Sequence, residues 1–283
     1  MHKFIALLSW VALSVCLNAQ LTLGPTVGTF GVLAGSTVTN TGNTTVIGNL
    51  GVSPGSAITG FTGFGSGGPG IVTGTIHAAD AFAAQAQTEL TTAYNSAAGA
   101  SSTGVAPGDL GGNTYTAGVY TNASSVGITG TVTLNAQNNS SAQFIFQIGS
   151  TLTANVGSTV NLINGALPAN VFWQVGSSAT VGTGASFSGN ILAFSSISLG
   201  TSASFQGRAL ARNAAVTLLG NALTTPPTLG GTGGGPPTSG GGGGGGGGSS
   251  APAPSSLILV AIALVCAGIY GARKRLPKLM GRN

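Results

Sequence analysis

The sequence predicts an all-β fold, an irregular β-helix in which short strands stack in successive coils. Two internal repeats carry this prediction. Residues 183–193 (TGASFSGNILA) return 18 residues later as residues 201–211 (TSASFQGRALA), with seven of eleven positions identical. Residues 144–153 (FIFQIGSTLT) return in altered form 27 residues later, as residues 171–180 (VFWQVGSSAT). A short period of alternating apolar and small polar residues, with frequent glycine, is typical of a solenoid.

The repeat length also predicts the shape of one coil. A strand rises ~3.3 Å per residue, so 18 residues suffice for one circuit of three short strands and three tight corners. The unequal spacings predict loops that bulge from some coils. Between residues 109 and 225, the apolar residues spaced as inward positions are Val119, Val132, Leu134, Phe144, Phe146, Val160, Leu162, Phe172, Phe187, Ile191, Ile197, Leu199, Phe205 and Leu218. Their expected outward neighbours are Thr131, Thr133, Thr159, Ser186, Ser204 and Thr217.

One amphipathic helix is predicted ahead of these coils. Its apolar stripe follows three- and four-residue steps over about 20 residues and consists of Ala79, Phe82, Ala83, Ala86, Leu90, Ala93, Tyr94 and Ala97. We expect Gly99 to end the helix. Because a lone helix must bury such a stripe, we expect it to pack along one flank of the coils.

His77 and Asp80 open this helix one turn apart. They could be a metal-binding or acid–base pair. The interpretation that we favour is structural: Asp80 stabilises the helix amino terminus, and His77 packs nearby.

Charged residues are scarce, at 4% of the chain against ~25% in ordinary soluble domains. Between residues 20 and 225 the only ones are Asp80, Glu89, Asp109, Arg208 and Arg212. A nucleic-acid surface needs rows of lysine and arginine to displace counterions, so we expect no nucleic-acid partner. Both cysteines, Cys16 and Cys266, lie in the terminal apolar segments, which leaves the body without disulfide or thiol chemistry.

Catalysis is also disfavoured by composition. A nucleophile needs an adjacent base, glycoside hydrolysis needs two carboxylates across a bond, and a divalent metal needs several convergent ligands. Residues 20–225 contain one histidine and three acids, two of which lie on the predicted helix. We therefore predict a protein that is not an enzyme and has no catalytic residues, no cofactor and no metal site.

The chain divides into four parts. Residues 1–19 have the basic start, apolar run and small-residue end of a secretory signal. An alternative, acylation of Cys16 as in a lipoprotein, is disfavoured by the bulky Val15. Residues 20–225 form the β-helix domain, and residues 226–253 form a linker rich in Gly, Pro and Ser. In residues 254–283, an apolar helix over 257–272 precedes the basic cluster of residues 273–275, which would hold that end in the cytoplasm.

This C-terminal arrangement resembles bacterial sorting signals of the PEP-CTERM type. Such signals carry Pro-Glu-Pro, whereas this chain has Pro252, Ala253 and Pro254. A simple tail anchor is the alternative. We expect an exported protein, extracellular or held at the cell surface, whose C-terminal segment contacts the membrane before any processing.

The remaining functional candidate is the surface of the coils. Faces rich in Thr, Ser and Ala, with neighbouring coils ~4.7–4.9 Å apart, hydrate weakly, because no ionised group draws water into its own shell. Their methyl groups favour ordered water and their hydroxyls can anchor it, which suits contact with ice. Thr is also common on strands for packing reasons alone. A cell-surface adhesin or coat protein without ice activity is therefore the alternative.

Several segments carry a family resemblance: residues 30–42 (FGVLAGSTVTNTG), 48–55 (GNLGVSPG), 77–80 (HAAD), 90–95 (LTTAYN), 144–153 and 207–213 (GRALARN). Over residues 21–225 the chain resembles the DUF3494 family, the type I microbial ice-binding proteins. This resemblance implies a discontinuous right-handed β-helix with one long helix alongside. It also implies export and adsorption to ice through one flat face, with thermal hysteresis and inhibition of ice recrystallisation. We expect the partner to be the ice crystal surface and the protein to be a monomer.

Two patterns select candidate ice-binding residues. The repeat register selects Thr159, Thr183, Ser186, Thr201 and Ser204, with Thr131 added. Some family members carry Thr-Ala/Gly-x-Thr/Asn on the binding face, a pattern that Thr41 and Thr44 fit here. We expect Thr183 to stack on Thr201 and Ser186 on Ser204 in successive coils. The two patterns could mark different faces.

Overall fold

The computed structural model describes residues 20–65 and 67–226 of the 283-residue chain. The predicted signal segment, the linker beyond Pro226 and the C-terminal apolar segment lie outside the described residues. Within the described ranges, no helix is both long enough and apolar enough to cross a membrane.

Seven parallel strands form the smaller of two sheets, which we call the narrow sheet. Each neighbouring pair keeps a continuous register. In spatial order the strands are β11 (Val126–Ile128), β14 (Leu152–Ala154), β17 (Ala179–Val181), β19 (Ile197–Leu199), β21 (Val216–Leu219), β2 (Thr37–Thr41) and β5 (Ala57–Thr59).

Fifteen strands form the second sheet, called the wide sheet. Its main path is β6 (Ile71–Val72), β3 (Thr45–Ile47), β22 (Ala222–Thr224), β20 (Ser204–Ala211), β18 (Ser186–Ala193), β16 (Val171–Val175), β13 (Phe144–Ile148), β10 (Gly118–Asn122) and β8 (Gly104–Val105). Six strands branch from this path: β1 (Phe30–Ala34), β4 (Asn49–Val52), β7 (Ile76–Ala78), β9 (Thr114–Tyr115), β12 (Thr131–Asn135) and β15 (Thr159–Ile163).

The wide sheet supplies two sides of each coil because its longest strands turn a corner. The first part of β20 pairs with β22 and the second part with β1; β18 is divided in the same way between β15 and β16. The corner lies at Gly189, whose φ is +115°, and at Gly207 beside it. A Cβ on Gly207 would meet the carbonyl oxygen of Gly189, so only glycine allows the two strands to stack there. With the narrow sheet, each coil has three sides.

The predicted repeat spacings are confirmed by the strand pairing. The 18-residue repeat corresponds to β18 and β20, which pair without interruption from Ser186 with Ser204 to Ala193 with Ala211. The 27-residue repeat places Phe144 beside Val171 in the wide sheet and Thr153 beside Thr180 in the narrow sheet. The prediction of an irregular β-helix is therefore correct.

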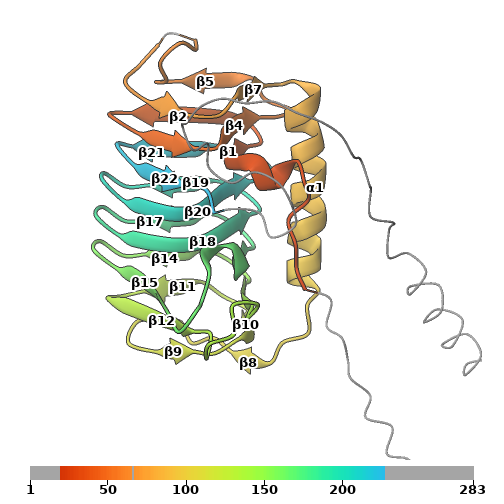
Figure 1. Ribbon diagram of the computed structural model, residues 1–283, viewed down its shortest axis with the longest axis vertical. Helices are drawn as coiled ribbons and strands as arrows, with labels where there is room; N and C mark the ends of the chain where they lie inside the picture. The colour runs from red at the N-terminus through yellow and green to blue at the C-terminus, as the bar shows by residue number, and fades with distance from the viewer. Residues whose placement is uncertain (1–19, 66, 227–283) are drawn as a thin grey trace, which may run out of the picture. The chain divides into compact units, whose positions relative to one another are not determined.

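The coils do not stack in chain order. The first strands, β1, β2 and β3, pair with the last, β20, β21 and β22. Figure 1 shows this as a colour change: the red and orange coils lie next to the blue ones, while the yellow coils lie at the far end of the stack. The stack is discontinuous because the chain leaves one end of it at β7 and re-enters at the other end at β8.

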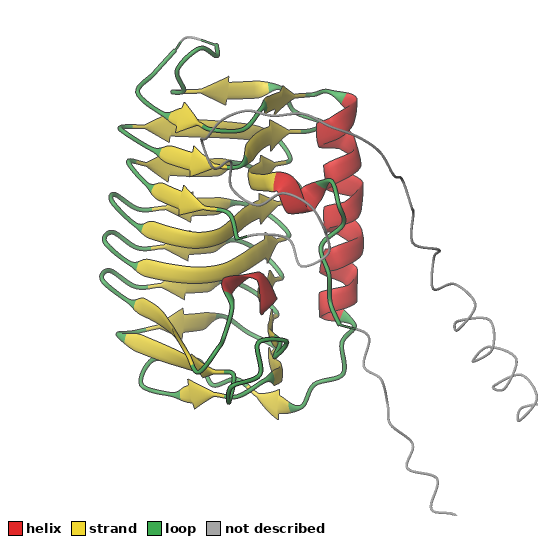
Figure 2. Cartoon of the chain, in the orientation of Figure 1, coloured by secondary structure: helices red, strands yellow, loops and turns green. Residues whose placement is uncertain are grey.

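Helix α1 (Ala81–Ala98) makes this connection along one flank of the coils (Figure 2). Eight strand-to-strand steps separate β7 from β8, or ~38 Å at ~4.8 Å a step. Eighteen helical residues cover ~27 Å of that distance, and the flanking loops cover the rest. Asp80 is the N-cap and Gly99 the C-cap, so the predicted helix end is confirmed.

The apolar stripe of α1 is buried as predicted, with two exceptions. Ala83 is buried, and Ala86, Leu90, Ala93, Tyr94 and Ala97 pack on wide-sheet residues that include Leu33, Ile145, Phe172, Leu192 and Leu210. Ala79 precedes the N-cap, with φ +53°. Phe82 is 40% exposed and stacks on His77 at the first turn. Ala79 lies outside the helix, which begins after Asp80, whereas Phe82 lies in the first helical turn and is only partly covered, by Phe30 and His77.

A second apolar cluster fills the interior of the coils. An aromatic column runs along its axis from Tyr120 through Phe146, Trp173 and Phe187 to Phe205, with successive ring centroids 4.3–5.5 Å apart. Most of the predicted inward residues belong to this cluster, with Leu162 partly buried against it. The prediction is wrong for Phe172 and Val119, which pack in the cluster beneath α1 and not inside the coils. Their strands alternate, so one face of each points inward and the other toward the helix.

Candidate functional site

The three acidic side chains each bind backbone N–H groups. Asp80 accepts a hydrogen bond from Ala83 N at 2.8 Å, and Glu89 accepts from Thr26 N and Val27 N at 2.8 and 2.9 Å. Asp109 accepts from Gly111 N and Thr129 N, both at 2.9 Å. Hydrogen bonds from Gly111 and Thr129 hold the pKa of Asp109 below its usual value. Burial alone would raise the pKa of Asp80 and of Glu89, but their hydrogen bonds outweigh it and lower both.

Asp80 caps helix α1 and His77 packs beside it, as expected. Nδ1 of His77 lies 2.7 Å from Oδ2 of Asp80, whose other carboxylate oxygen caps α1. The imidazole stacks on Phe82, with ring centroids 4.6 Å apart. In the part of the chain that the structure describes, no group of three or more His, Cys, Asp or Glu could hold a metal ion. Each acid accepts hydrogen bonds that stabilise the local backbone.

Four of the eight candidate ice-binding residues form one row across the wide sheet. Thr131 pairs with Thr159, Thr159 with Ser186, and Ser186 with Ser204. The row continues through Ala222 and Thr45 to Ile71. We call these seven residues the wide-sheet ladder.

The other four candidates lie elsewhere. Thr183 and Thr201 occupy exposed turns at the corner between the two sheets, and Thr41 ends strand β2 of the narrow sheet. Thr44 is 1% exposed; its hydroxyl donates to Asn40 Oδ1 and accepts from Asn221 N. Thr44 is therefore not available at the protein surface, because its hydroxyl is buried and hydrogen-bonded within the fold. The residues selected by the repeat register and those selected by the Thr-Ala/Gly-x-Thr/Asn pattern thus lie in different parts of the fold.

A second ladder, which the sequence patterns missed, runs across the whole narrow sheet. It consists of the central outward residues Gly127, Thr153, Thr180, Ser198, Thr217, Thr39 and Thr59, each paired with the next. We call these residues the narrow-sheet ladder. Six of its seven members carry a hydroxyl. The 27-residue repeat, which ends on Thr153 and Thr180, was the available signal for it.

A parallel row adds more small residues to this face. This row consists of the residues that directly precede the first inward residue of each strand: Ser125, Thr151, Ser178, Ser196, Ala215, Thr37 and Ala57. Some of these hydroxyls bind across coils: Thr151 donates to Ser125 at 2.8 Å, and the hydroxyls of Ser178 and Ser196 are 2.9 Å apart. No charged residue lies on the seven strands of this sheet, and Asp109 forms an isolated bridge with Gly127 at its end. The narrow sheet thus presents two regular rows of hydroxyl and methyl groups.

The other two sides of the coils are less regular. One is covered by α1. The side that carries the wide-sheet ladder ends in exposed apolar residues, Ile47 at 45% and Ile71 at 54%. Beside it, the short 3-10 helix η2 (Pro168–Asn170) packs against β18 and β20. Among the described residues, the narrow sheet therefore offers the longest uninterrupted surface of small side chains.

This architecture is shared with a known protein family. A family model described as Ice-binding-like matches residues 32–224. The chain belongs to the ice-binding-like family. The expected resemblance to DUF3494 proteins is confirmed at the level of the family and its fold.

Relatives of this ice-binding-like chain share most of their length with it. The ice-binding protein of Nostoc sp. (strain HG1) is 47% identical over 215 residues, which cover 74% of this chain and 77% of the relative. A solved ice-binding protein from an Antarctic biological consortium has a TM-score of 0.70 and 45% identity, covering 76% of this chain and 96% of its own. For the DUF3494 domain of Shewanella frigidimarina ice-binding protein 1 the TM-score is 0.67 and the identity 30%, with coverage of 73% and 98%. These relatives are named for ice binding and not for catalysis, in agreement with the predicted absence of enzyme activity.

Proposed function

We propose that this chain binds ice through the outer face of the narrow sheet. The narrow-sheet ladder carries the proposal: it is a row of hydroxyls across six adjacent strands, none of which contains a charged residue. The family and its named relatives support ice as the ligand.

The chemistry of the face suits a lattice of ordered water. Neighbouring strands are ~4.8 Å apart, and successive outward residues on one strand are ~6.7 Å apart, so the hydroxyls form a two-dimensional array. Each hydroxyl both donates and accepts, and each Thr methyl group lies against water without binding it. A single contact is weak, but a rigid array engages many positions at once without losing further side-chain freedom.

Adsorption of this kind changes how ice grows. A bound molecule that leaves the surface slowly forces the ice front to curve outward between neighbouring molecules, and a curved front melts more readily than a flat one. The local freezing point falls below the melting point, and large crystals stop growing at the expense of small ones. No cofactor is needed.

Two matched substitutions test which face binds. Thr180 lies on the narrow-sheet ladder and Thr131 on the wide-sheet ladder, and both are exposed. We expect Thr180→Tyr to reduce thermal hysteresis several-fold and Thr131→Tyr to leave it nearly unchanged, because only the first places a bulky ring over the array. Both variants should keep the unfolding temperature of the parent, since neither side chain is in the core.

Each other result has a definite meaning. Loss of activity in Thr131→Tyr alone would move the site to the wide-sheet ladder. A third variant, Thr183→Tyr, tests the corner between the sheets, and loss of activity in this variant alone would move the site there. Round crystals and normal coarsening from a folded parent protein would refute ice binding, and an adhesin or coat protein would then be the leading explanation.

We also propose that the protein is exported and tethered. The signal-like residues 1–19, the Gly-rich linker and the apolar segment with its basic tail support this proposal. Cell fractionation tests the tether: the full chain should sediment with membranes, and a chain that ends at Pro226 should appear in the medium. Equal release of both chains would refute the tether without bearing on ice binding.

A further inference from the structure

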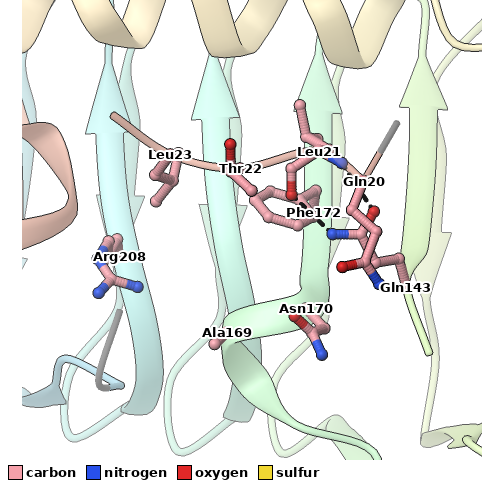
Figure 3. A pocket seen from close by; sticks show the side chains of 9 residues that line it. All are labelled: Gln20, Leu21, Thr22, Leu23, Gln143, Ala169, Asn170, Phe172 and Arg208. Carbon is pink, nitrogen blue, oxygen red and sulfur yellow. Dashed lines mark hydrogen bonds between the residues drawn. The ribbon is translucent and has the colours of Figure 1, made fainter. Parts of the chain in front are cut away.

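A small cavity lies between the first described residues and the wide sheet. It has a volume of about 80 Å³ and is lined by Gln20, Leu21, Thr22, Leu23, Gln143, Ala169, Asn170, Phe172 and Arg208. Figure 3 shows Arg208 at one end of the cavity and Gln20 and Gln143 at the other. Two hydrogen bonds between Gln143 and Leu21, at 2.6 and 2.9 Å, hold the covering segment in place.

Arg208 is 2% exposed and donates to three oxygen atoms. Nε and Nη2 reach Gly28 O at 2.9 and 2.7 Å, Nη2 reaches Pro226 O at 2.6 Å, and Nη1 reaches Asn190 Oδ1 at 3.0 Å. A guanidinium has five N–H groups, so the second N–H of Nη1 has no partner among the described residues. Every partner of the cation is an uncharged oxygen.

The chain contains no side-chain carboxylate to neutralise this charge. Its three acids are Asp80, Glu89 and Asp109, and each is committed to backbone N–H groups elsewhere. Burial lowers the pKa of Arg208 to about 10, which leaves the group protonated at neutral pH. A buried charge without a counter-charge carries a large desolvation cost.

We propose that this cavity holds a compact inorganic anion, of the size of chloride, beside the Arg208 guanidinium. The volume of about 80 Å³ equals the share of roughly two or three waters, which suits one such ion with a water. No Asp or Glu lines the cavity, and the apolar walls from Leu21, Leu23 and Phe172 strengthen the attraction between the two charges. The anion would stabilise the segment over residues 20–23 and, through Arg208, the backbone at Pro226.

Stability in matched salts tests the proposal on the full-length chain. Sodium chloride is compared with sodium gluconate, whose anion is too large for the cavity, at equal ionic strength. We expect the unfolding temperature to rise by roughly 3–6 °C for each tenfold increase in chloride above its Kd, and to rise less in gluconate. The variant Ala169→Leu, which fills the cavity, should remove the difference, and the control Ala84→Leu on the exposed side of α1 should keep it.

Bromide in a crystal gives an independent measurement that does not depend on the variants. An anomalous peak within contact distance of the Arg208 guanidinium would support the site. Equal stability in the two salts, an unchanged difference in Ala169→Leu, or a cavity that contains water but no bromide would each overturn it. None of these outcomes depends on ice binding.

Discussion

Each coil turns from the narrow sheet into the wide sheet through a residue in the left-handed region. Four of these residues stand two positions before the wide-sheet ladder: Gly157 (φ +66°), Gly184 (φ +66°), Ser202 (φ +56°) and Gly220 (φ +64°). Ser202 is the exception to glycine in this column. A Cβ at Gly157 or Gly184 would meet nothing within 4 Å, so the preference for glycine reflects backbone conformation and not space.

We expect Ser202→Gly to stabilise the protein by about 1 kcal/mol, since it removes the strain of a side chain at positive φ. Thermal unfolding measures this as a rise of a few degrees. The control is Gly184→Ala, which introduces the same strain one coil away and should lower stability by a similar amount. A loss of stability in Ser202→Gly would show that the serine makes a contribution that outweighs its strained backbone.

Thr44 shows what a sequence pattern cannot reveal about a single residue. With Thr41 it fits a family motif for the binding face, yet its hydroxyl is bonded to Asn40 and to the backbone of Asn221. Asn221 is 177 residues away along the chain. Its proximity follows from the out-of-order stacking of coils, which no local pattern contains.

At the scale of elements, α1 is joined to the first described residues through Glu89. Its carboxylate binds Thr26 N and Val27 N, next to the short 3-10 helix η1 (Val27–Thr29). A group whose pKa is lower in the folded state than in the unfolded state stabilises the fold above its unfolded pKa. This contribution is lost as the pH falls through the folded value.

We therefore expect Glu89→Gln to lower the unfolding temperature at neutral pH, because the charged acceptor is lost. The difference from the parent should shrink as the pH falls below the ordinary value of 4.5. Unfolding temperatures measured between pH 7 and pH 2.5 test this. Asp109→Asn removes a similar acceptor far from α1 and should show the same pH dependence, because hydrogen bonds also lower the pKa of Asp109. A Glu89→Gln effect that is independent of pH would indicate lost packing instead of lost charge.

The elements themselves were largely predictable. The repeats predicted that β18 lies beside β20 and β13 beside β16. The apolar stripe predicted α1 and its end at Gly99. Phe172 was assigned to the wrong cluster because β16 is buried on both faces. Without alternation between apolar and polar residues, a strand gives no signal of which face points inward.

At the scale of the whole molecule, the narrow-sheet ladder has one gap. Gly127 occupies the position where the other six residues carry a hydroxyl, and a Cβ there would make only ordinary contacts, the nearest 3.6 Å from Gly108 O. We expect Gly127→Thr to extend the array by one strand and to raise thermal hysteresis modestly.

The matched control is Ala222→Thr, which fills a similar gap in the wide-sheet ladder. Hysteresis measured at equal protein concentrations should rise only in the first variant. A rise in Ala222→Thr alone would place ice contact on the wide sheet, and a rise in both would mean that added hydroxyls act wherever they lie.

The sequence could not predict which face of the coils is free to bind ice, because this depends on how the whole chain is arranged. The repeats show which residues stack in neighbouring coils. Thr159, Ser186 and Ser204 do lie in one row, but Thr183 and Thr201, which were selected with them, lie at the corner. The repeats do not show what covers each side. That depends on α1 and on η2, both of which lie outside the repeats.

The connection by α1 also links two lengths that evolution could otherwise vary separately. An additional coil would lengthen the stack by ~4.8 Å, and the helix would need about three more residues to follow it at 1.5 Å each. Three residues are close to one helical turn, so the inserted segment would return the apolar stripe to the same flank. Growth in steps of one coil and one turn together preserves both cores, whereas an inserted coil without the added turn would require the loops that flank α1 to stretch over the extra distance.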